Sequence, residues 1–183
     1  TGKTTLVREL LQQERGRLIW LLAPTGKAAA RLRESLAPLP ESMRCATVHR
    51  ALEADGTGSY RRGHQRPLEA EVVVVDEVSM LDSGLMQALL DALPPTTRLI
   101  LVGDPAQLPP IGGSGVLNTL EQKLREQKPQ HLQRLERSHR FNDATALGRF
   151  VQRLRQGVGG AELQQLLQEQ SGGNLSWWPL QPC

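Results

Sequence analysis

The chain has 183 residues, which is enough for one α/β domain with a core of its own. Hydrophobic residues make up 39% and charged residues 22%, an ordinary globular balance, and no apolar run approaches the length of a membrane span. The net charge of +3 and the isoelectric point of about 9.2 fit a nucleic-acid partner without requiring one. Because only 3% of residues are aromatic, aliphatic side chains must fill most of the core.

The two cysteines, Cys45 and Cys183, lack the spacing of a metal site, and we expect both to be free thiols in a reducing cytosol. The chain starts at Thr1, with no Met and no signal-peptide pattern. We therefore expect a cytoplasmic protein that does not associate with a membrane, and a sequence truncated at both ends.

The first half of the chain alternates helical and strand-like patterns. Apolar residues at helical spacing after position 5 predict a helix that ends near Gly16. Residues 18–22 form an apolar run typical of a buried parallel strand, and residues 27–36 read as a helix before Pro38. The polar segment 52–67, rich in Gly and Arg, is predicted to be an exposed loop.

The second half continues the alternation. Four consecutive valines predict a strand at 72–75, and Ser83 is the expected cap of a helix that runs to about Ala92. The remaining expected elements are a strand at 99–102, a turn at 112–115, a helix at 116–127, a weaker strand at 132–135, helices at 144–155 and 161–169, and a final strand at 175–178. This order predicts an α/β fold with a parallel sheet covered by helices on both faces.

A partial phosphate-binding motif opens the chain. Gly2-Lys3-Thr4 supplies the last three elements of the pattern Gly-x-x-x-x-Gly-Lys-Ser/Thr. Gly2 would let the backbone approach a phosphate, Lys3 would neutralise phosphate oxygens, and the Thr4 hydroxyl would ligate Mg²⁺. The following helix would point its N-terminal amides at the anion. A solvated N-terminus is the alternative interpretation of so short a motif, and other motifs must support the first one.

Two carboxylates follow the valine strand directly. Asp76 would hold Mg²⁺, and Glu77 would orient and deprotonate an attacking water. Ligands bind at the carboxyl ends of strands in such sheets, which is where these two acids are expected. The alternative is a strand that ends in two solvated acids, and the upstream Gly-Lys-Thr makes that alternative much less favourable.

Two further polar residues follow predicted strands. Gln107, after the strand at 99–102, has one amide oxygen and one NH₂ group with which to sense a γ-phosphate or its water. Arg140, after the strand at 132–135, would stabilise charge in a transition state. An Asp-Pro turn and a basic surface cluster are the respective alternatives, and chemistry alone does not reject them.

Taken together, these segments resemble the superfamily 1 helicases, specifically the RecD-like branch. The matching segments occur in the family's order over roughly residues 1–156. They are Gly2-Lys3-Thr4-Thr5 (motif I), residues 23–32 (motif Ia), Thr47-Val48-His49-Arg50, residues 75–80 (motif II), residues 103–110 (motif III) and Ser138-His139-Arg140-Phe141 (motif IV).

The resemblance implies a RecA-like P-loop NTPase fold over residues 1–183, with 157–183 as the start of an interdomain region. It also implies ATP and Mg²⁺ as cofactors, ATP contacts from Gly2 to Thr5, single-stranded DNA as the track, and movement from 5′ to 3′. Other subunits of a helicase–nuclease complex are implied partners. The Gly-rich half of motif I and motifs V and VI are absent from this sequence, so we expect little or no ATP hydrolysis from these 183 residues alone.

Motif Ia suggests contacts to DNA. Pro24 and Thr25 come where a strand ends, and their backbone and hydroxyl could grip a phosphate or sugar. Lys27 lies in a Gly-Lys-Ala sequence without the following Ser/Thr, so we assign it to structure or DNA rather than ATP. His49 could stack on a base, with a backbone-satisfied histidine at a helix start as the alternative.

Three functions remain open from the sequence. The first is an ATP-driven DNA motor acting in recombination or repair. The second is a relaxase-linked or RNA-directed helicase on the same core. The third is a nucleotide-binding assembly module that does not hydrolyse ATP. The basic segment 61–66 is expected to be a solvated loop rather than a DNA clamp, and Trp177 and Trp178 are expected to pack in a core or between domains.

Overall fold

The computed structural model describes residues 2–14, 16–104, 107 and 116–133. Contacts divide the chain into one unit that comprises Lys3–Arg134 and a second that comprises residues 1–2 and 135–183. The fold described below belongs to the first unit. None of the helices in the described ranges combines the length and the apolar character that a membrane crossing requires.

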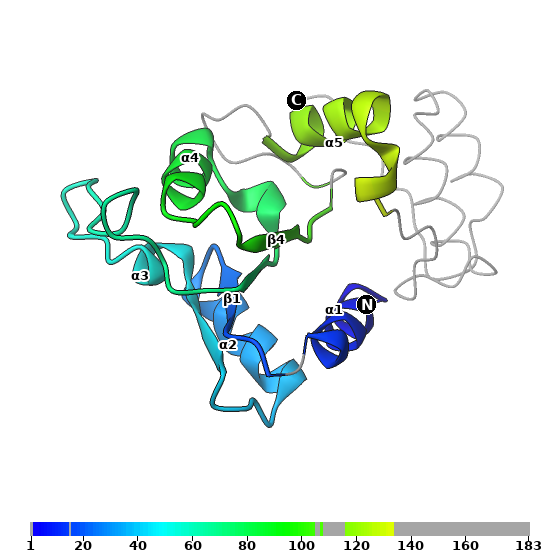
Figure 1. The fold of residues 1–183 in the computed structure, drawn as a ribbon, viewed down its shortest axis with the longest axis horizontal. Coiled ribbons are helices and arrows are strands. Elements are labelled where there is room, and N and C mark those ends of the chain that lie inside the picture. The colour runs from blue at the N-terminus through cyan, green and yellow to red at the C-terminus, as the bar shows by residue number, and fades with distance from the viewer. Residues whose placement is uncertain (1, 15, 105–106, 108–115, 134–183) are drawn as a thin grey trace, which may run out of the picture. The chain divides into compact units, whose positions relative to one another are not determined.

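A parallel four-stranded sheet is the centre of this unit. Its strands are β1 (Ile19–Ala23), β2 (Met43–Thr47), β3 (Val72–Val75) and β4 (Arg98–Leu101), in the spatial order β2-β1-β3-β4 (Figure 1). In the register, Leu22 of β1 lies opposite Val75 of β3, and Val75 lies opposite Leu101 of β4. All strand pairs are parallel, so their carboxyl ends meet at one edge. The predicted α/β fold with a parallel sheet is confirmed.

Helices connect the strands. They are α1 (Gly2–Gln13), α2 (Gly26–Leu36), α3 (Val48–Ala51), α4 (Ser83–Asp91), α5 (Val116–Gln127) and the short 3₁₀ segments η1 (Val78–Met80) and η2 (Pro129–His131). The expected helices at 27–36, 83–92 and 116–127 match α2, α4 and α5 to within one residue. The first helix starts earlier than expected, because Gly2 to Thr5 already form the first turn of α1.

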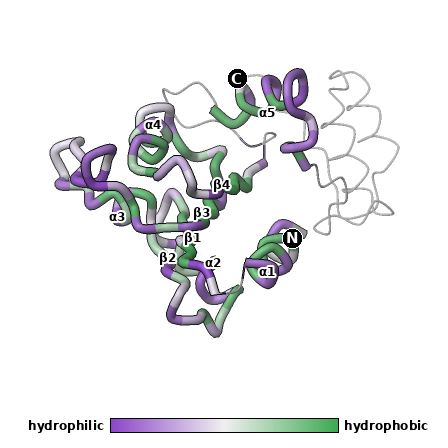
Figure 2. The backbone as a smooth tube through the Cα atoms, viewed as in Figure 1, coloured by the Kyte–Doolittle hydropathy of each residue, from purple (hydrophilic) through white to green (hydrophobic). Residues whose placement is uncertain are grey.

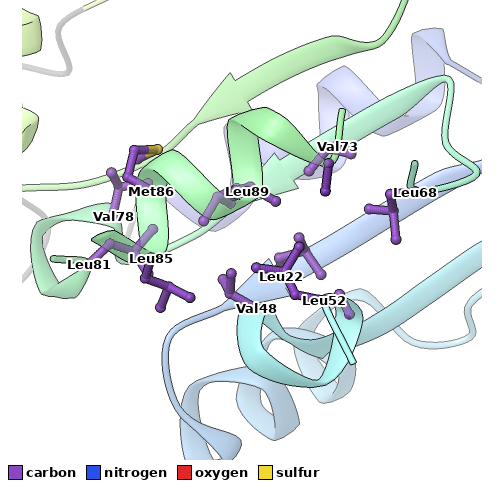
Figure 3. Close-up of a cluster of buried hydrophobic side chains, with 13 residues drawn as sticks. Leu22, Val48, Leu52, Leu68, Val73, Val78, Leu81, Leu85, Met86 and Leu89 are labelled. Atoms are coloured by element: carbon purple, nitrogen blue, oxygen red, sulfur yellow. The ribbon is translucent and has the colours of Figure 1, made fainter. Parts of the chain in front are cut away.

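The sheet packs a hydrophobic core on each face, as predicted. On β3, Val72 and Val74 join a cluster with Val7 of α1 and Leu32 of α2. Successive strand residues point to opposite faces, so the other two valines join the second cluster. That cluster includes Val48, Leu52, Val73, Leu85 and Leu89, and it draws on β1, β3, α3 and α4 (Figure 3). Figure 2 shows the hydrophobic colouring of the strands between the two helix layers.

The core is aliphatic, as the low aromatic content predicts. All four valines of β3 are completely buried, and each contributes about 1.5–3 kcal/mol relative to an exposed position. The indole of Trp20 is only half-buried. It donates its N–H to the carbonyl of Glu69 at 3.0 Å, and the Arg44 guanidinium lies 5.5 Å from its ring centroid.

The structure corrects several expectations. β2 was not predicted, a helix start at His49 was only the alternative interpretation there, and Leu52, placed in an exposed loop, is completely buried under the sheet. Asp82 rather than Ser83 caps α4: its backbone is extended and its carboxylate accepts the N–H of Leu85 at 2.8 Å. Leu132 and residue 133 are not in a strand. The expected elements at 112–115, 144–155, 161–169 and 175–178 lie outside the described residues.

Helix α1 runs antiparallel to β4 and is tied to it at both ends. The carboxylate of Glu14, just after α1, is buried and accepts from the guanidinium of Arg98, the first residue of β4. Glu14 also pairs with Arg17 at 2.9 Å. At the other end, the Lys3 ammonium pairs with Asp104, beyond the end of β4. These ion pairs hold the Gly-Lys-Thr segment at the carboxyl edge of the sheet.

Candidate active site

The carboxyl edge of the sheet gathers the polar segments that the sequence singles out. The backbone N–H of Asp76 donates to the carbonyl of Leu22 at 2.9 Å, so the ends of β1 and β3 stay paired. The N–H of Val102 donates to the carbonyl of Val75 at 2.8 Å, which does the same for β3 and β4. Pro24, Asp76 and Gly103 therefore leave the sheet side by side.

Lys3 reaches this edge from the first turn of α1. Its Nζ lies 3.9 Å from Asp104 Oδ2, and both side chains are about one-third exposed. The first four N–H groups of a helix have no partner within the helix, so the start of α1 offers backbone donors beside a cation. Gly2 and Thr4 lie in the same turn, and Thr5 is exposed. Backbone donors with a lysine form an arrangement that suits an anion such as phosphate.

Asp76 and Glu77 stand half-buried at the end of β3. Asp76 Oδ1 accepts the backbone N–H of Glu77 at 2.9 Å, which fixes one oxygen of that carboxylate. Glu77 adopts a left-handed backbone with φ 53° and ψ 40°. A residue other than glycine pays roughly 1–2 kcal/mol for this conformation. Such outliers often occur at functional sites, where the surrounding structure enforces them.

Backbone hydrogen bonds around Glu77 enforce this geometry. Val78 donates its N–H to the carbonyl of Val102 at 3.0 Å, and Met80 donates to the carbonyl of Glu77 at 3.0 Å. Val78 is completely buried, so the turn at Glu77 carries the chain from β3 directly into the core through η1. The left-handed residue is thus where a strand becomes a short helix, with an acidic side chain at the bend.

Gln107 is joined to the same turn. Its backbone N–H donates to the carbonyl of Asp104 at 3.1 Å, and its Oε1 accepts a hydrogen bond from the hydroxyl of Ser79 at 3.3 Å. Gln107 is exposed, whereas Ser79 is only 6% exposed. Sequence reasoning missed Ser79, because its partner lies 28 residues away and no local pattern marks the pair.

The residues at this edge fit Mg²⁺ by their chemistry. Asp76 offers carboxylate oxygen, the donor that Mg²⁺ prefers, and the residue type of Thr4, in the first turn of α1, supplies a hydroxyl. Within the described ranges no group of three or more His, Cys, Asp or Glu side chains gathers around a metal position. Mg²⁺ in nucleotide sites takes one or two protein oxygens and completes its shell with phosphates and water.

The candidate DNA-contacting residues lie around the ends of β1 and β2. Thr25 caps α2, where its Oγ1 accepts the N–H of Ala28 at 3.2 Å, and Lys27 is exposed in the first turn of that helix. His49 is exposed in α3, and its ring lies 6.2 Å from that of Tyr60. Pro24 is half-buried. Thr25 and Lys27 thus follow β1, the strand next to the β3 strand that carries the acidic pair, and His49 follows β2, one strand further out.

Two arginines of the basic segment 61–66 form ion pairs with a glutamate of the same domain. Glu53 accepts from Arg62 Nε and from Arg66 Nη1, both at 2.8 Å. The hydrogen bond from Arg62, together with the charges of both arginines, lowers the pKa of Glu53 below its ordinary value. Arg61 and His64 are exposed. Arg140, the remaining predicted catalytic residue, lies outside the described residues, as do Trp177 and Trp178.

A parallel sheet between two helix layers, with Gly-Lys-Thr opening a helix at its carboxyl edge beside an Asp-Glu pair, defines a RecA-like P-loop α/β domain. The chain belongs to the AAA domain family, whose family model matches residues 1–172.

Curated relatives agree with the resemblance seen in the sequence. The RecBCD enzyme subunit RecD of Mycolicibacterium smegmatis is 36% identical over 97% of this chain and 35% of its own length. The RecD subunit of Mycobacterium tuberculosis H37Rv is 38% identical over 89% and 32%. The ATP-dependent RecD2 DNA helicase of Deinococcus radiodurans is 41% identical over 67% and 16%. The chain is therefore similar to RecD-like proteins, and it spans about a third of the length of the first two.

A solved structure of two coordinating Pif1 helicases at forked double-stranded DNA aligns with 66% of this chain and 31% of its own chain. The sequence identity is 21% and the TM-score is 0.42, which is a weak likeness.

Proposed function

We propose that this chain is the ATP-binding motor domain of a DNA helicase that acts in recombination or repair. In this function ATP binding and hydrolysis drive movement along single-stranded DNA. The observation that carries the proposal is the gathering of Lys3, the Asp76–Glu77 pair and Gln107 at one sheet edge. A solvated N-terminus would not place Lys3 against Asp104, at the sheet edge where the Asp76–Glu77 pair also lies. The similarity to RecD and RecD2 proteins supports the same function.

The residues take separate roles in this proposal. The backbone of Gly2 to Thr5 and the Lys3 ammonium bind the ATP phosphates. Thr4 and Asp76 hold Mg²⁺, which neutralises phosphate charge when bound. Glu77 orients the attacking water and accepts its proton. Gln107 contacts the γ-phosphate or that water, and Arg140 stabilises the transition-state charge.

Pro24, Thr25, Lys27 and His49 form the proposed DNA face. The Thr25 oxygen accepts the capping bond of α2, and its O–H still has a proton to donate to a phosphate oxygen. Lys27 adds an exposed positive charge in the same helix turn. The His49 ring offers a flat surface for a base. As in the relatives named RecBCD subunits, other subunits of a helicase–nuclease complex are proposed partners.

The test is steady-state ATP hydrolysis by the full-length natural protein, with and without single-stranded DNA, beside Glu77→Gln. We expect strong stimulation by DNA and a loss of about a hundredfold or more in kcat for Glu77→Gln, because a positioned general base contributes about 10²–10⁴. Glu34→Gln, which alters an exposed glutamate of α2, is the matched control and should keep wild-type activity.

Other outcomes point to other functions. Stimulation by RNA alone would replace the DNA motor with an RNA-directed helicase on the same core. ATP binding without hydrolysis, whatever nucleic acid is present, would leave a nucleotide-binding assembly module.

A further inference from the structure

Ser79 stands out as a buried polar side chain to which the proposed mechanism gives no role. It sits in the middle of η1, two residues after Glu77, and is 6% exposed. Its hydroxyl donates to Gln107 Oε1 at 3.3 Å. A buried hydroxyl needs a hydrogen-bond partner, and Ser79 uses one of the proposed ATP-contacting groups for this purpose.

Ser79 is held in place by the backbone. The residue before it donates its N–H to Val102, and the residue after it donates to Glu77, both at 3.0 Å. The chain that leaves β4 packs closely on this turn: a Cβ on Gly103 would lie 3.4 Å from the Ser79 nitrogen and 2.6 Å from Leu117 Cδ2. The position of Ser79 is therefore restrained by its neighbours, whereas Gln107 is an exposed side chain with three rotatable bonds.

The direction of the hydrogen bond decides how the glutamine amide is turned. A glutamine side chain has one acceptor oxygen and one NH₂ group with two donors. Because the Ser79 hydroxyl donates to Oε1, the NH₂ group is left to donate to another acceptor. A phosphate oxygen is only an acceptor, so this is the end of the amide that a γ-phosphate requires.

We propose that Ser79 is a positioning residue that turns the Gln107 amide so that its NH₂ group donates to the γ-phosphate in the transition state of hydrolysis, an interaction that acts on kcat and not on KM. The inference rests on the proposed function, since it needs Gln107 to act on ATP. The inference also connects the acidic turn to the glutamine. The η1 segment, which directly follows Glu77, determines the orientation of the Gln107 amide in the chain beyond β4. Ser79 itself touches neither ATP nor water in this role.

The test is a double-mutant cycle in the full-length protein with saturating single-stranded DNA: wild type, Ser79→Ala, Gln107→Ala and the double variant. We expect Ser79→Ala to lower kcat about three- to tenfold, the effect of one lost hydrogen bond, with KM within twofold of wild type. Removing Ser79 should cost nothing further when Gln107 is already alanine, because the serine acts only through the glutamine.

Three further measurements separate positioning from a structural role. Ser79→Thr keeps the hydroxyl and should retain most of the activity. The Kd for a fluorescent non-hydrolysable ATP analogue should be unchanged in Ser79→Ala. Ser79→Cys keeps the volume with only a weak donor, and the same cycle is run with it if the alanine variant does not fold.

Two results would overturn the proposal. One is an equal loss for the serine variant in both Gln107 backgrounds, and the other is a changed KM with an unchanged kcat. The wild-type and Glu77→Gln rates, measured first, report separately on the proposed function, because a failure of hydrolysis would be seen there before any serine variant is compared.

Discussion

Lys3 Nζ lies 3.9 Å from Asp104 Oδ2, so the lysine proposed to bind phosphate is in contact with a carboxylate. Both side chains are about one-third exposed, and a contact of this kind contributes at most about 1 kcal/mol. Nucleotide binding would exchange the Asp104 carboxylate for a phosphate, so this acid competes with the ligand for the lysine.

Asp104→Asn should therefore tighten ATP binding, by up to about fivefold for a contact of that size. Titration of the full-length protein with a fluorescent ATP analogue measures the change. Asp91→Asn removes the same charge at the end of α4, which packs on the opposite face of the sheet from α1, and should leave Kd unchanged. Weaker binding in Asp104→Asn would mean that the acid orients the lysine for phosphate instead of competing for it.

The left-handed backbone of Glu77 lowers the stability of the fold. Glycine adopts the left-handed region freely, so Glu77→Gly removes a cost of roughly 1–2 kcal/mol and adds about 0.5–1 kcal/mol of chain entropy loss. We expect Glu77→Gly to raise the urea midpoint slightly while abolishing ATP hydrolysis. Glu77→Gln keeps the strained backbone and should lose hydrolysis without gaining stability. A glycine variant less stable than the glutamine variant would contradict this account.

Arg98 should matter more to stability than an ordinary surface arginine. Its partner Glu14 is buried, and removal of Arg98 leaves that carboxylate with Arg17 as its one ion-pair partner among the described residues. We expect Arg98→Ala to lower the free energy of unfolding by about 1–2 kcal/mol, measured by urea denaturation. Arg125→Ala, which breaks an i,i+4 pair with Glu121 on α5, is the control and should cost about 0.5 kcal/mol or less.

Cys45 gives a prediction for alkaline pH. Burial raises the pKa of its thiol, against the opposing effect of Arg33, and the thiol donates to the carbonyl of Ala29 at 3.3 Å. The pKa of the thiol is therefore higher in the folded state than in the unfolded state. The neutral thiol then makes its full contribution to the free energy of unfolding at pH values below the unfolded-state pKa. This contribution is lost as pH rises through the folded pKa.

In a Cys183→Ser background, raising the pH from 7 to 10 should therefore lower the urea midpoint more with Cys45 present than with Cys45→Ala. Iodoacetamide should also modify Cys45 slowly at neutral pH and faster as pH rises, because the thiolate is the reactive form. Rapid modification at neutral pH would contradict the raised pKa.

How far the sequence predicts the fold depends on how each segment is buried. The strand at Val72–Val75 was predicted to the residue, because four buried β-branched side chains end abruptly at two acids. The strand at Met43–Thr47 was missed, because it lies at the sheet edge, has only half-buried or exposed residues and includes Arg44. An edge strand needs no continuous apolar run, so its pattern does not separate it from a loop.

The candidate site divides in the same way. Lys3, Asp76 and Glu77 were found because they form local motifs, and the parallel sheet predicts that such motifs share an edge. Ser79 and Asp104 were missed as partners, because their contacts join segments far apart in the chain. The choice of Asp82 over Ser83 as the cap depends on the backbone angles at one residue, since both residue types cap helices well.

The hydrogen bond from the Asp76 N–H to the Leu22 carbonyl joins the strands that lead to the two proposed binding sites, so these sites lie close together. Asp76 belongs to the half of the edge proposed to bind nucleotide, and Leu22 leads within two residues to Pro24 in the half proposed to bind DNA. The two halves are thus one interstrand step apart, about 4.8 Å. A shift of β3 against β1 on ATP turnover would move the segment proposed to contact DNA directly, and no long relay of side chains across the domain would be required.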